Sequence, residues 1–176
     1  TTATLAVVHR SVITIAQVGD SRAYLVRAGE ARQITKDQSL IQRLIDAGEM
    51  TEGEAAHSDR RNIILQALGS EATVVPDMYR ELAEVGDVLV LCSDGLSNLV
   101  GANDIARIAL ADDNMETVCE RLVACANSRG GHDNITVVAA RFEPADPNEP
   151  PPSPAPPATR ESTSPGLSDR VRRWLR

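Results

Sequence analysis

The chain has 176 residues, of which 42% are hydrophobic and 2% aromatic, and its formal net charge is −7 at pH 7. This length is enough for one ordinary hydrophobic core, which Val, Ile, Leu and Ala must build because aromatic side chains are scarce. The negative charge disfavours nonspecific binding to nucleic acid, so we predict no nucleic-acid partner.

The first part of the chain is predicted to form strands. Residues 4–9 and 11–18 should be joined by a tight turn, and residues 23–27 should pair with residues 31–35 across a turn that contains Gly29. A helix is then predicted to begin at Ser39 and to end near Gly48, and its apolar face should carry Leu40, Leu44 and Ile45.

The rest of the domain is predicted to mix helices and strands. The sequence TEGE at residues 51–54 fits a capping box and should open a second short helix. Further strands are expected at residues 78–83, 88–92 and 135–142, and further helices at residues 103–110 and 115–128. Antiparallel strands mixed with helices indicate the α+β class.

The composition changes after residue 143. Nine of the ten prolines lie between Pro144 and Pro165, so residues 144–166 are predicted to form a disordered linker. Residues 167–176 place apolar side chains at helical spacing among arginines, as a basic amphipathic tail. We favour a solvated tail over a membrane contact because so short a helix is marginal in water.

The cysteines and the hydropathy pattern bear on the cellular compartment in which the protein is expected. Cys92, Cys119 and Cys125 are odd in number and lack C-x-x-C spacing, which favours buried, reduced thiols over zinc ligands or a disulfide. No stretch approaches the length of a membrane span, and no signal peptide is visible. We therefore predict a cytoplasmic location.

Three aspartates stand where an apolar run meets a turn. The run DVLVLC ends in Ser93, Asp94 and Gly95, the run VITIAQV leads into Asp20, and Asp133 comes just before NITVV. Carboxylates at strand ends lie where side chains of neighbouring strands converge, and hard cations prefer oxygen ligands. The pattern therefore predicts a metal cluster.

Several segments around these residues carry a family resemblance. They are VGDSRAY (18–24), ITKDQSL (34–40), RRNIILQALG (60–69), CSDGL (92–96) and GHDNITV (131–137). In this order they resemble the PPM-type, metal-dependent protein serine/threonine phosphatases (the type 2C phosphatases), most closely the bacterial ones. The resemblance covers residues 1 to about 142.

The resemblance also implies an architecture. The family pattern begins upstream with an arginine, an acidic residue and a DGMGG segment, whereas this chain opens with a TT pair that resembles the GTT that follows them. Residues 1–143 are therefore expected to be the C-terminal part of a phosphatase domain. The implied fold is a β-sandwich of mainly antiparallel strands flanked by helices, with the N-terminal strands missing.

The implied reaction is hydrolysis of phosphoserine and phosphothreonine by a water that bridges Mn²⁺ or Mg²⁺ ions, two or three in number. Asp94 and Asp133 match the family's two C-terminal metal ligands, and Asp20 matches a position that helps to hold a third, weaker ion. The residues expected to support these ligands are Ser93, Gly95 and Asn134. For Asp20 and Asn134, a purely turn-forming role remains the alternative.

Other polar residues of the matching segments are expected to be structural. Arg22 and Asp37 should be structural, either as an ion pair or as a tie between loops. His132 should be an incidental loop residue, because a carboxylate site for a hard metal needs no histidine, and His57 should lie at the surface of a flap-like region.

Two other functions compete with this interpretation. The sequence GDS also matches Gly-Asp-Ser esterases, but their chemistry needs a histidine base, usually in Asp-x-x-His, and the chain contains no such sequence. The stronger alternative is a catalytically incomplete, phosphatase-like binding or regulatory module that lacks the upstream metal ligands. The expected partners are phosphoproteins, including a serine/threonine kinase and its substrates.

Overall fold

The computed structural model describes residues 1–55, 58, 60 and 63–144. His57, the basic tail and all of the predicted linker except Pro144 therefore lie outside the described residues. No helix within the described part of the chain is both long and apolar enough to cross a membrane.

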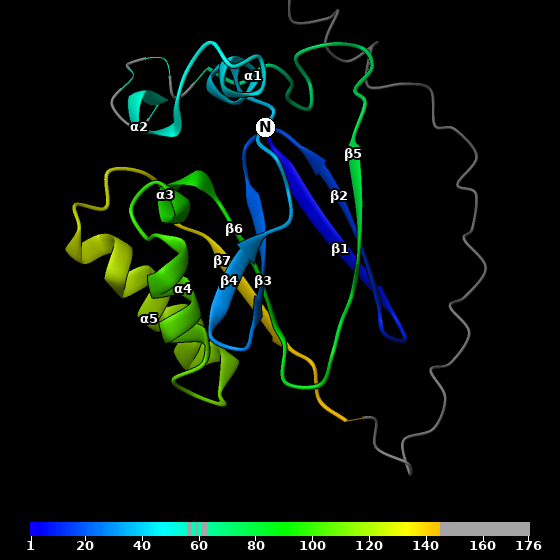
Figure 1. Cartoon of the computed structure of the whole chain (residues 1–176), viewed down its shortest axis with the longest axis vertical. Coiled ribbons are helices and arrows are strands. Elements are labelled where there is room, and N and C mark those ends of the chain that lie inside the picture. The colour runs from blue at the N-terminus through cyan, green and yellow to red at the C-terminus, as the bar shows by residue number, and fades with distance from the viewer. Residues whose placement is uncertain (56–57, 59, 61–62, 145–176) are drawn as a thin grey trace, which may run out of the picture. The chain divides into compact units, whose positions relative to one another are not determined.

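The described strands form two antiparallel sheets, which confirms the predicted fold class (Figure 1). The three-stranded sheet has the order β1-β2-β5, with β1 at Ala3–His9, β2 at Val12–Val18 and β5 at Asp77–Leu82. The four-stranded sheet has the order β4-β3-β6-β7, with β3 at Arg22–Arg27, β4 at Glu30–Gln33, β6 at Val88–Cys92 and β7 at Val137–Arg141.

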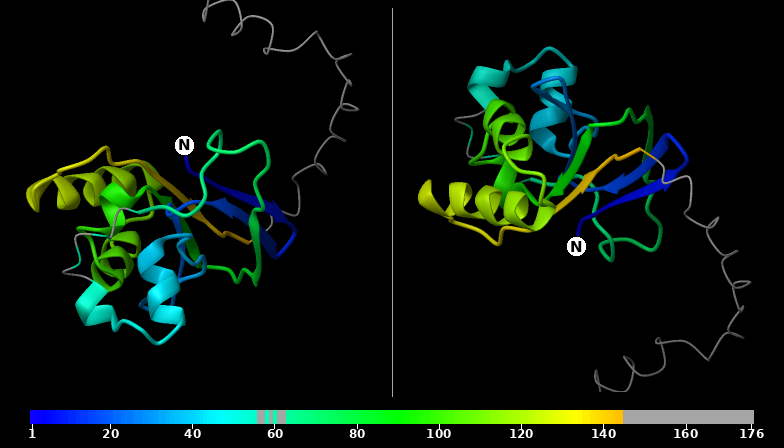
Figure 2. Two further views of the ribbon diagram at one scale, coloured as in Figure 1. Left: turned by 90° about the horizontal axis from the view of Figure 1, so that it is seen from above. Right: turned by 90° about the horizontal axis from the view of Figure 1, so that it is seen from below.

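The helices of the described part are α1 (Leu40–Asp46), α2 (Glu52–Ala55), α3 (Asp94–Ser97), α4 (Ala102–Ala109) and α5 (Met115–Ser128). Helices α4 and α5 pack on the four-stranded sheet, through β3 and β4 for α4 and through β7 for α5. The three-stranded sheet covers the other face, as the views in Figures 1 and 2 show. The four-stranded sheet is therefore the middle layer.

This middle position explains the uninterrupted apolar run of β6. Leu89 faces the core between the two sheets with Ile13, Ile15 and Leu25. Its neighbours in the strand, Val88 and Val90, face a second core under the helices, with Val118, Leu122 and Ala126 of α5. A strand that is buried on both faces has no polar alternation, unlike a strand with one wet face.

The starts of α1 and α2 are capped as the sequence predicts. The Ser39 hydroxyl accepts a hydrogen bond from the Gln42 N–H (3.2 Å) at the start of α1. At α2, the Glu54 carboxylate accepts from the Thr51 N–H (2.8 Å), and the Thr51 hydroxyl accepts from the Glu54 N–H (3.3 Å). These paired bonds form the predicted capping box.

Some local expectations were wrong. The Ser-Asp-Gly sequence after β6 does not make a simple turn, because it opens the short helix α3. In α1 the buried residue is Ile41, while Leu40, Leu44 and Ile45 are only half-buried. The tertiary contacts of so short a helix, rather than its periodicity, decide which face is covered.

The cysteines are free thiols, as expected. Cys92 is buried in the core under the helices, and this burial raises the pKa of its thiol to about 12. Cys119 and Cys125 are only half-buried, so the prediction of buried thiols is wrong for these two.

An ion pair between the buried Asp87 and the partly exposed Arg27 holds the connection between β5 and β6. The Asp87 side chain is only 2% exposed and accepts two hydrogen bonds from Arg27, at 2.9 Å from Nε and 2.6 Å from Nη2. It also accepts one from the Glu84 N–H (2.7 Å). These donors, Arg27 above all, lower the pKa of Asp87 against the opposing effect of burial.

We predict that Asp87→Asn lowers the free energy of unfolding by about 1 to 3 kcal/mol, because the buried carboxylate loses its charge-assisted hydrogen bonds from Arg27. The matched control is Glu84→Gln, since Glu84 also pairs with Arg27 but is 69% exposed. That change should cost less than about 1 kcal/mol. Urea unfolding measures both, and equal losses would contradict the importance of the buried pair.

The same pair predicts a pH dependence. A carboxyl whose pKa is lowered by folding stabilises the fold above its ordinary pKa, and this contribution disappears as the pH falls through the lower, folded value. The difference in unfolding free energy between wild type and Asp87→Asn should therefore shrink as the pH falls below the ordinary carboxyl range. A difference that stays constant with pH would show that the charge of Asp87 contributes nothing.

Candidate metal centre

The register of the four-stranded sheet brings three connecting segments to the same edge, at the ends of the strands. Arg22, the first residue of β3, pairs with Cys92, the last residue of β6, which in turn pairs with the first residue of β7. Asp20 lies just before β3, Asp94 just after β6, and Asp133 in the loop that leads into β7. All three predicted ligands are therefore placed at the same edge.

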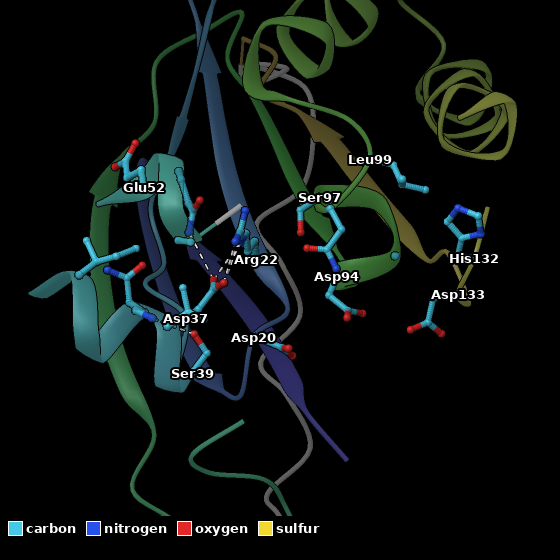
Figure 3. Close-up of a pocket in the computed structure, with 17 residues that line it drawn as sticks. Asp20, Arg22, Asp37, Ser39, Glu52, Asp94, Ser97, Leu99, His132 and Asp133 are labelled. Carbon is cyan, nitrogen blue, oxygen red and sulfur yellow. Dashed lines mark hydrogen bonds and ion pairs between the residues drawn. The ribbon is translucent and has the colours of Figure 1, made fainter. Parts of the chain in front are cut away.

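The three aspartates line one pocket of about 790 Å³. Figure 3 shows Asp94 drawn between Asp20 and Asp133. Helices α1 and α2 supply other parts of the wall through Ile41 and Glu52, among other residues. The pocket thus lies between the end of the four-stranded sheet and the α1–α2 segment.

The three aspartates of this pocket are not neutralised by basic side chains of the described residues. Within the described residues, no arginine or lysine forms an ion pair with Asp20, Asp94 or Asp133. Burial and then the negative charge of Asp94 raise the pKa of Asp20, against its own backbone hydrogen bond and the more distant charge of Arg22. Oxygen donors with surplus negative charge suit a hard cation such as Mn²⁺ or Mg²⁺.

The described residues do not, however, form a ready-made site. Among them, no group of three His, Cys, Asp or Glu side chains is assembled closely enough to hold a metal ion. The three aspartates line one pocket, Asp94 acts electrostatically on Asp20, and their residue type fits the implied ions.

The predicted supporting residues connect the loops of Asp94 and Asp133. The Ser93 N–H donates to the Thr136 carbonyl (3.1 Å), and the Thr136 N–H donates to the Ser93 hydroxyl (3.0 Å). The Ser93 hydroxyl in turn donates to the Asn134 carbonyl (3.0 Å), and the Asn134 N–H donates to the Asp133 carboxylate (2.7 Å). A side chain at Gly95 would collide with the same Asn134 carbonyl, so the two loops approach closely only because Gly95 has none.

The turn of Asp20 is held from several sides. Gly19 has a φ of +103°, a conformation that glycine adopts readily, and Thr2 fills the space where its side chain would lie. The Gln17 amide donates to the carbonyls of Gly19 (2.9 Å) and Ser21 (3.2 Å). Asp20 therefore projects from a fixed turn.

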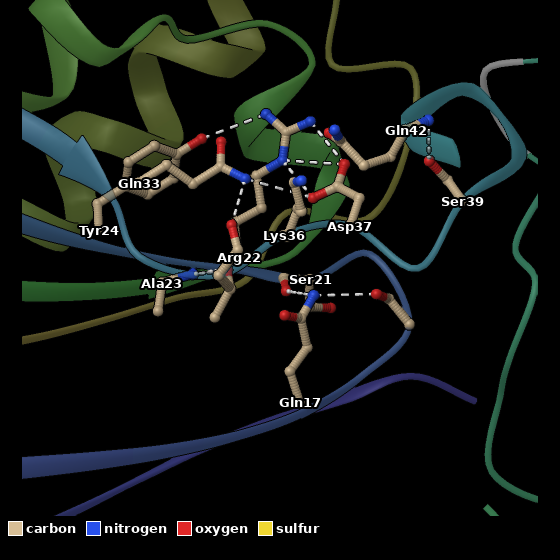
Figure 4. A network of polar contacts seen from close by, with 12 residues as sticks. Gln17, Ser21, Arg22, Ala23, Tyr24, Gln33, Lys36, Asp37, Ser39 and Gln42 are labelled. Carbon is tan, nitrogen blue, oxygen red and sulfur yellow. Dashed lines mark hydrogen bonds and ion pairs between the residues drawn. The ribbon is translucent and has the colours of Figure 1, made fainter. Parts of the chain in front are cut away.

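Arg22 and Asp37 form the predicted ion pair (Figure 4), with Nη2 and Nε of Arg22 at 2.7 Å and 2.9 Å from the carboxylate oxygens. Arg22 also donates to the Tyr24 hydroxyl (3.3 Å). Both members of the pair line the pocket, as does His132. Because the Arg22 guanidinium is already bound to Asp37, its main role is to hold the loop between β4 and α1 rather than to bind a ligand in the pocket.

Sequence reasoning missed Gln38, which contacts the backbone beside Asp20. It lies inside the ITKDQSL segment, between Asp37 and the capping residue Ser39, and this position was the available signal. A long polar side chain next to a helix N-cap can reach the end of a neighbouring strand. The sequence does not show which backbone group it would hydrogen-bond.

We predict that Gly95→Ala separates the Asp94 and Asp133 loops. The added Cβ would collide with backbone, which cannot move away as a flexible side chain would, so the expected loss is about 1 to 3 kcal/mol of unfolding free energy. Mn²⁺ affinity, measured by calorimetric titration, should fall as well. The control is Gly53→Ala in α2, where a Cβ would meet no atom within 4 Å, and an unchanged Mn²⁺ affinity in Gly95→Ala would contradict the prediction.

Comparison with known proteins agrees with this geometry. A family model described as protein phosphatase 2C matches residues 1–43. The serine/threonine phosphatase stp of Listeria monocytogenes is 39% identical over 138 residues, which are 78% of this chain and 55% of that protein. Protein phosphatase PhpP of Streptococcus pneumoniae is 41% identical over 133 residues, 76% of this chain and 54% of its own length.

Solved structures give the same result. The serine/threonine phosphatase of S. agalactiae superposes with a TM-score of 0.76 at 41% identity, over 81% of this chain and 59% of that one. The PstP catalytic domain in complex with two manganese ions has a TM-score of 0.70 at 36% identity, over 81% and 59%. The chain thus spans just over half the length of these relatives, and over that length it is similar to protein phosphatases of the 2C type.

Proposed function

We propose that this chain is part of a metal-dependent protein serine/threonine phosphatase that hydrolyses phosphoserine and phosphothreonine. The observation that carries the proposal is the pocket at the edge of the four-stranded sheet, where three aspartates without an ion-pair partner in the described residues lie together. The names of the relatives support the same activity.

In this proposal Asp94 and Asp133 hold Mn²⁺ or Mg²⁺, and Asp20 with Asp94 helps to hold a third ion. When bound, such ions lower the pKa of water and stabilise charge on phosphoryl oxygens. The relative that is described in complex with two manganese ions supports manganese. Such ions take more oxygen ligands than these carboxylates alone supply, and waters or other oxygen donors would complete the shell.

The residues of the chain have separate tasks. The Asp94 and Asp133 carboxylates bind and orient the cations, while Ser93 and Asn134 fix the distance between their loops. Ile41 and Ile45 of α1 line the pocket and offer apolar contact to the stem of a phosphorylated side chain. Because the chain is negatively charged, an anionic substrate depends on the cations for a local positive field.

The proposal extends to partners and location. Phosphoproteins are the substrates, and a serine/threonine kinase with its targets is the expected counterpart. Free thiols on Cys92, Cys119 and Cys125 support a cytoplasmic location.

The test is Mn²⁺-dependent phosphate release from p-nitrophenyl phosphate and from a phosphothreonine peptide, by this chain and by the complete protein that contains it. Asp94→Ala and Asp133→Ala should each lower kcat/KM by about 100-fold or more, since each removes a direct ligand. The control is Asp113→Ala, because the Asp113 side chain is 99% exposed and does not line the pocket.

The outcomes separate the two functions. Release that both ligand variants abolish and Asp113→Ala preserves supports the phosphatase. A complete, folded protein that binds phosphopeptide but releases no phosphate contradicts it and supports the binding or regulatory module instead.

A further inference from the structure

Gln38 holds the backbone immediately before Asp20 from both sides. The Gln38 N–H donates to the Gly19 carbonyl (2.9 Å), and the Gly19 N–H donates to the Gln38 side-chain oxygen (2.8 Å). Both peptide groups that flank the Gly19 α-carbon are therefore bound to one residue. Since Gly19 has a positive φ and few steric restraints of its own, these two bonds restrict its rotation.

The other polar groups of Gln38 reach the segment that returns from α2 to β5. Its side-chain N–H donates to the Asp77 carboxylate (2.8 Å), and its carbonyl accepts from the Leu65 N–H (2.8 Å). Its side-chain oxygen also accepts from the Gln66 amide (3.1 Å). Gln38 itself lies just before α1, and these partners lie between α2 and the start of β5. Gln38 therefore connects the Asp20 turn to both ends of the segment that contains α1 and α2.

Asp37, the neighbour of Gln38, holds the chain on the other side of Asp20. Asp37 pairs with Arg22, which follows Asp20 in the chain, while Gln38 binds Gly19, which precedes it. Gln17 also holds this turn, but through carbonyl groups within the β2–β3 connection. Among the described residues, it is Gln38 whose side-chain hydrogen bonds join the Asp20 turn directly to the connection between α1 and β5.

We propose that Gln38 is a positioning residue for Asp20, and that it thereby sets the affinity of the cation that Asp20 helps to bind. This inference rests on the proposed function, because it takes Asp20 as a ligand. Partners that orient a ligand from behind contribute to metal affinity because they hold the ligand in the binding geometry before the ion arrives. Movement of the α1–β5 connection would then change cation affinity through Gln38.

The test compares Gln38→Met with Gln66→Met in the complete protein. Methionine keeps the approximate size and flexibility of glutamine but cannot make the side-chain hydrogen bonds. Gln38→Met removes the bond from the Gly19 N–H together with those to Asp77 and from Gln66. Gln66→Met also removes three bonds, one to Gln38 and two with the Val75 backbone, but it leaves both contacts with Gly19. Mn²⁺ affinity is measured by calorimetric titration in both variants, in Asp20→Ala and in the double variant Asp20→Ala/Gln38→Met.

Gln38→Met should weaken the Asp20-dependent Mn²⁺ affinity by about tenfold, and Gln66→Met should leave it close to that of the wild type. The double variant should bind Mn²⁺ no more weakly than Asp20→Ala alone, because Gln38 acts through Asp20. Additive losses, or equal effects of the two methionine variants, would overturn the proposal.

Amide hydrogen exchange of the metal-free protein gives a second readout that does not depend on the proposed function. The Gly19 amide should exchange faster in Gln38→Met and at the wild-type rate in Gln66→Met. Unchanged protection of Gly19 in Gln38→Met would overturn the positioning role. Mn²⁺ binding that is insensitive to Asp94→Ala and Asp133→Ala would instead contradict the proposed function. It would also contradict the effect of Gln38 on cation affinity, but not its effect on the Gly19 backbone.

Discussion

The structure of the candidate site depends on the antiparallel register of β3, β6 and β7. Because Arg22, Cys92 and Val137 lie in one row across the sheet, the connections before β3, after β6 and before β7 emerge at the same edge. A slip of one residue would also turn every side chain of these strands to the opposite face. The two cores, which cover both faces of the middle sheet, therefore fix the register and with it the position of the aspartates.

The site gathers three aspartates that have no ion-pair partner among the described residues. Asp37 and Asp87 are both engaged by arginine, whereas no described arginine or lysine forms an ion pair with Asp20, Asp94 or Asp133. Repulsion between neighbouring carboxylates costs stability, and the bonds around Ser93 and Gly19 oppose that repulsion by holding the loops in place. A cation would convert this repulsion into attraction, which is why the arrangement fits a metal centre better than a structural turn cluster.

The sequence predicts most of the strands and helices because their patterns are local. The capping box at Thr51, the glycine turn at Gly29 and the apolar runs of β2 and β6 each report on neighbouring residues alone. The short helix α3 was missed because its first residues also fit a turn. The identity of the aspartates came from their positions at strand ends and from the family resemblance.

The bonds of Gln38 and the close approach of Gly95 to Asn134 join segments far apart in the chain, and no local pattern encodes them. They depend on how the α1–β5 connection and the loop before β7 pack against the sheet edge. Residues of this kind become visible only when the packing of the segments is known. Sequence alone therefore identified the ligand candidates but not the groups that hold them.

Anomalous X-ray scattering from manganese-soaked crystals of the complete protein would test the central claim most directly. If the sheet edge is a metal centre, an anomalous peak will lie in contact with the carboxylates of both Asp94 and Asp133. Anomalous peaks that appear only elsewhere, or none at saturating Mn²⁺, would contradict the assignment of these aspartates as ligands.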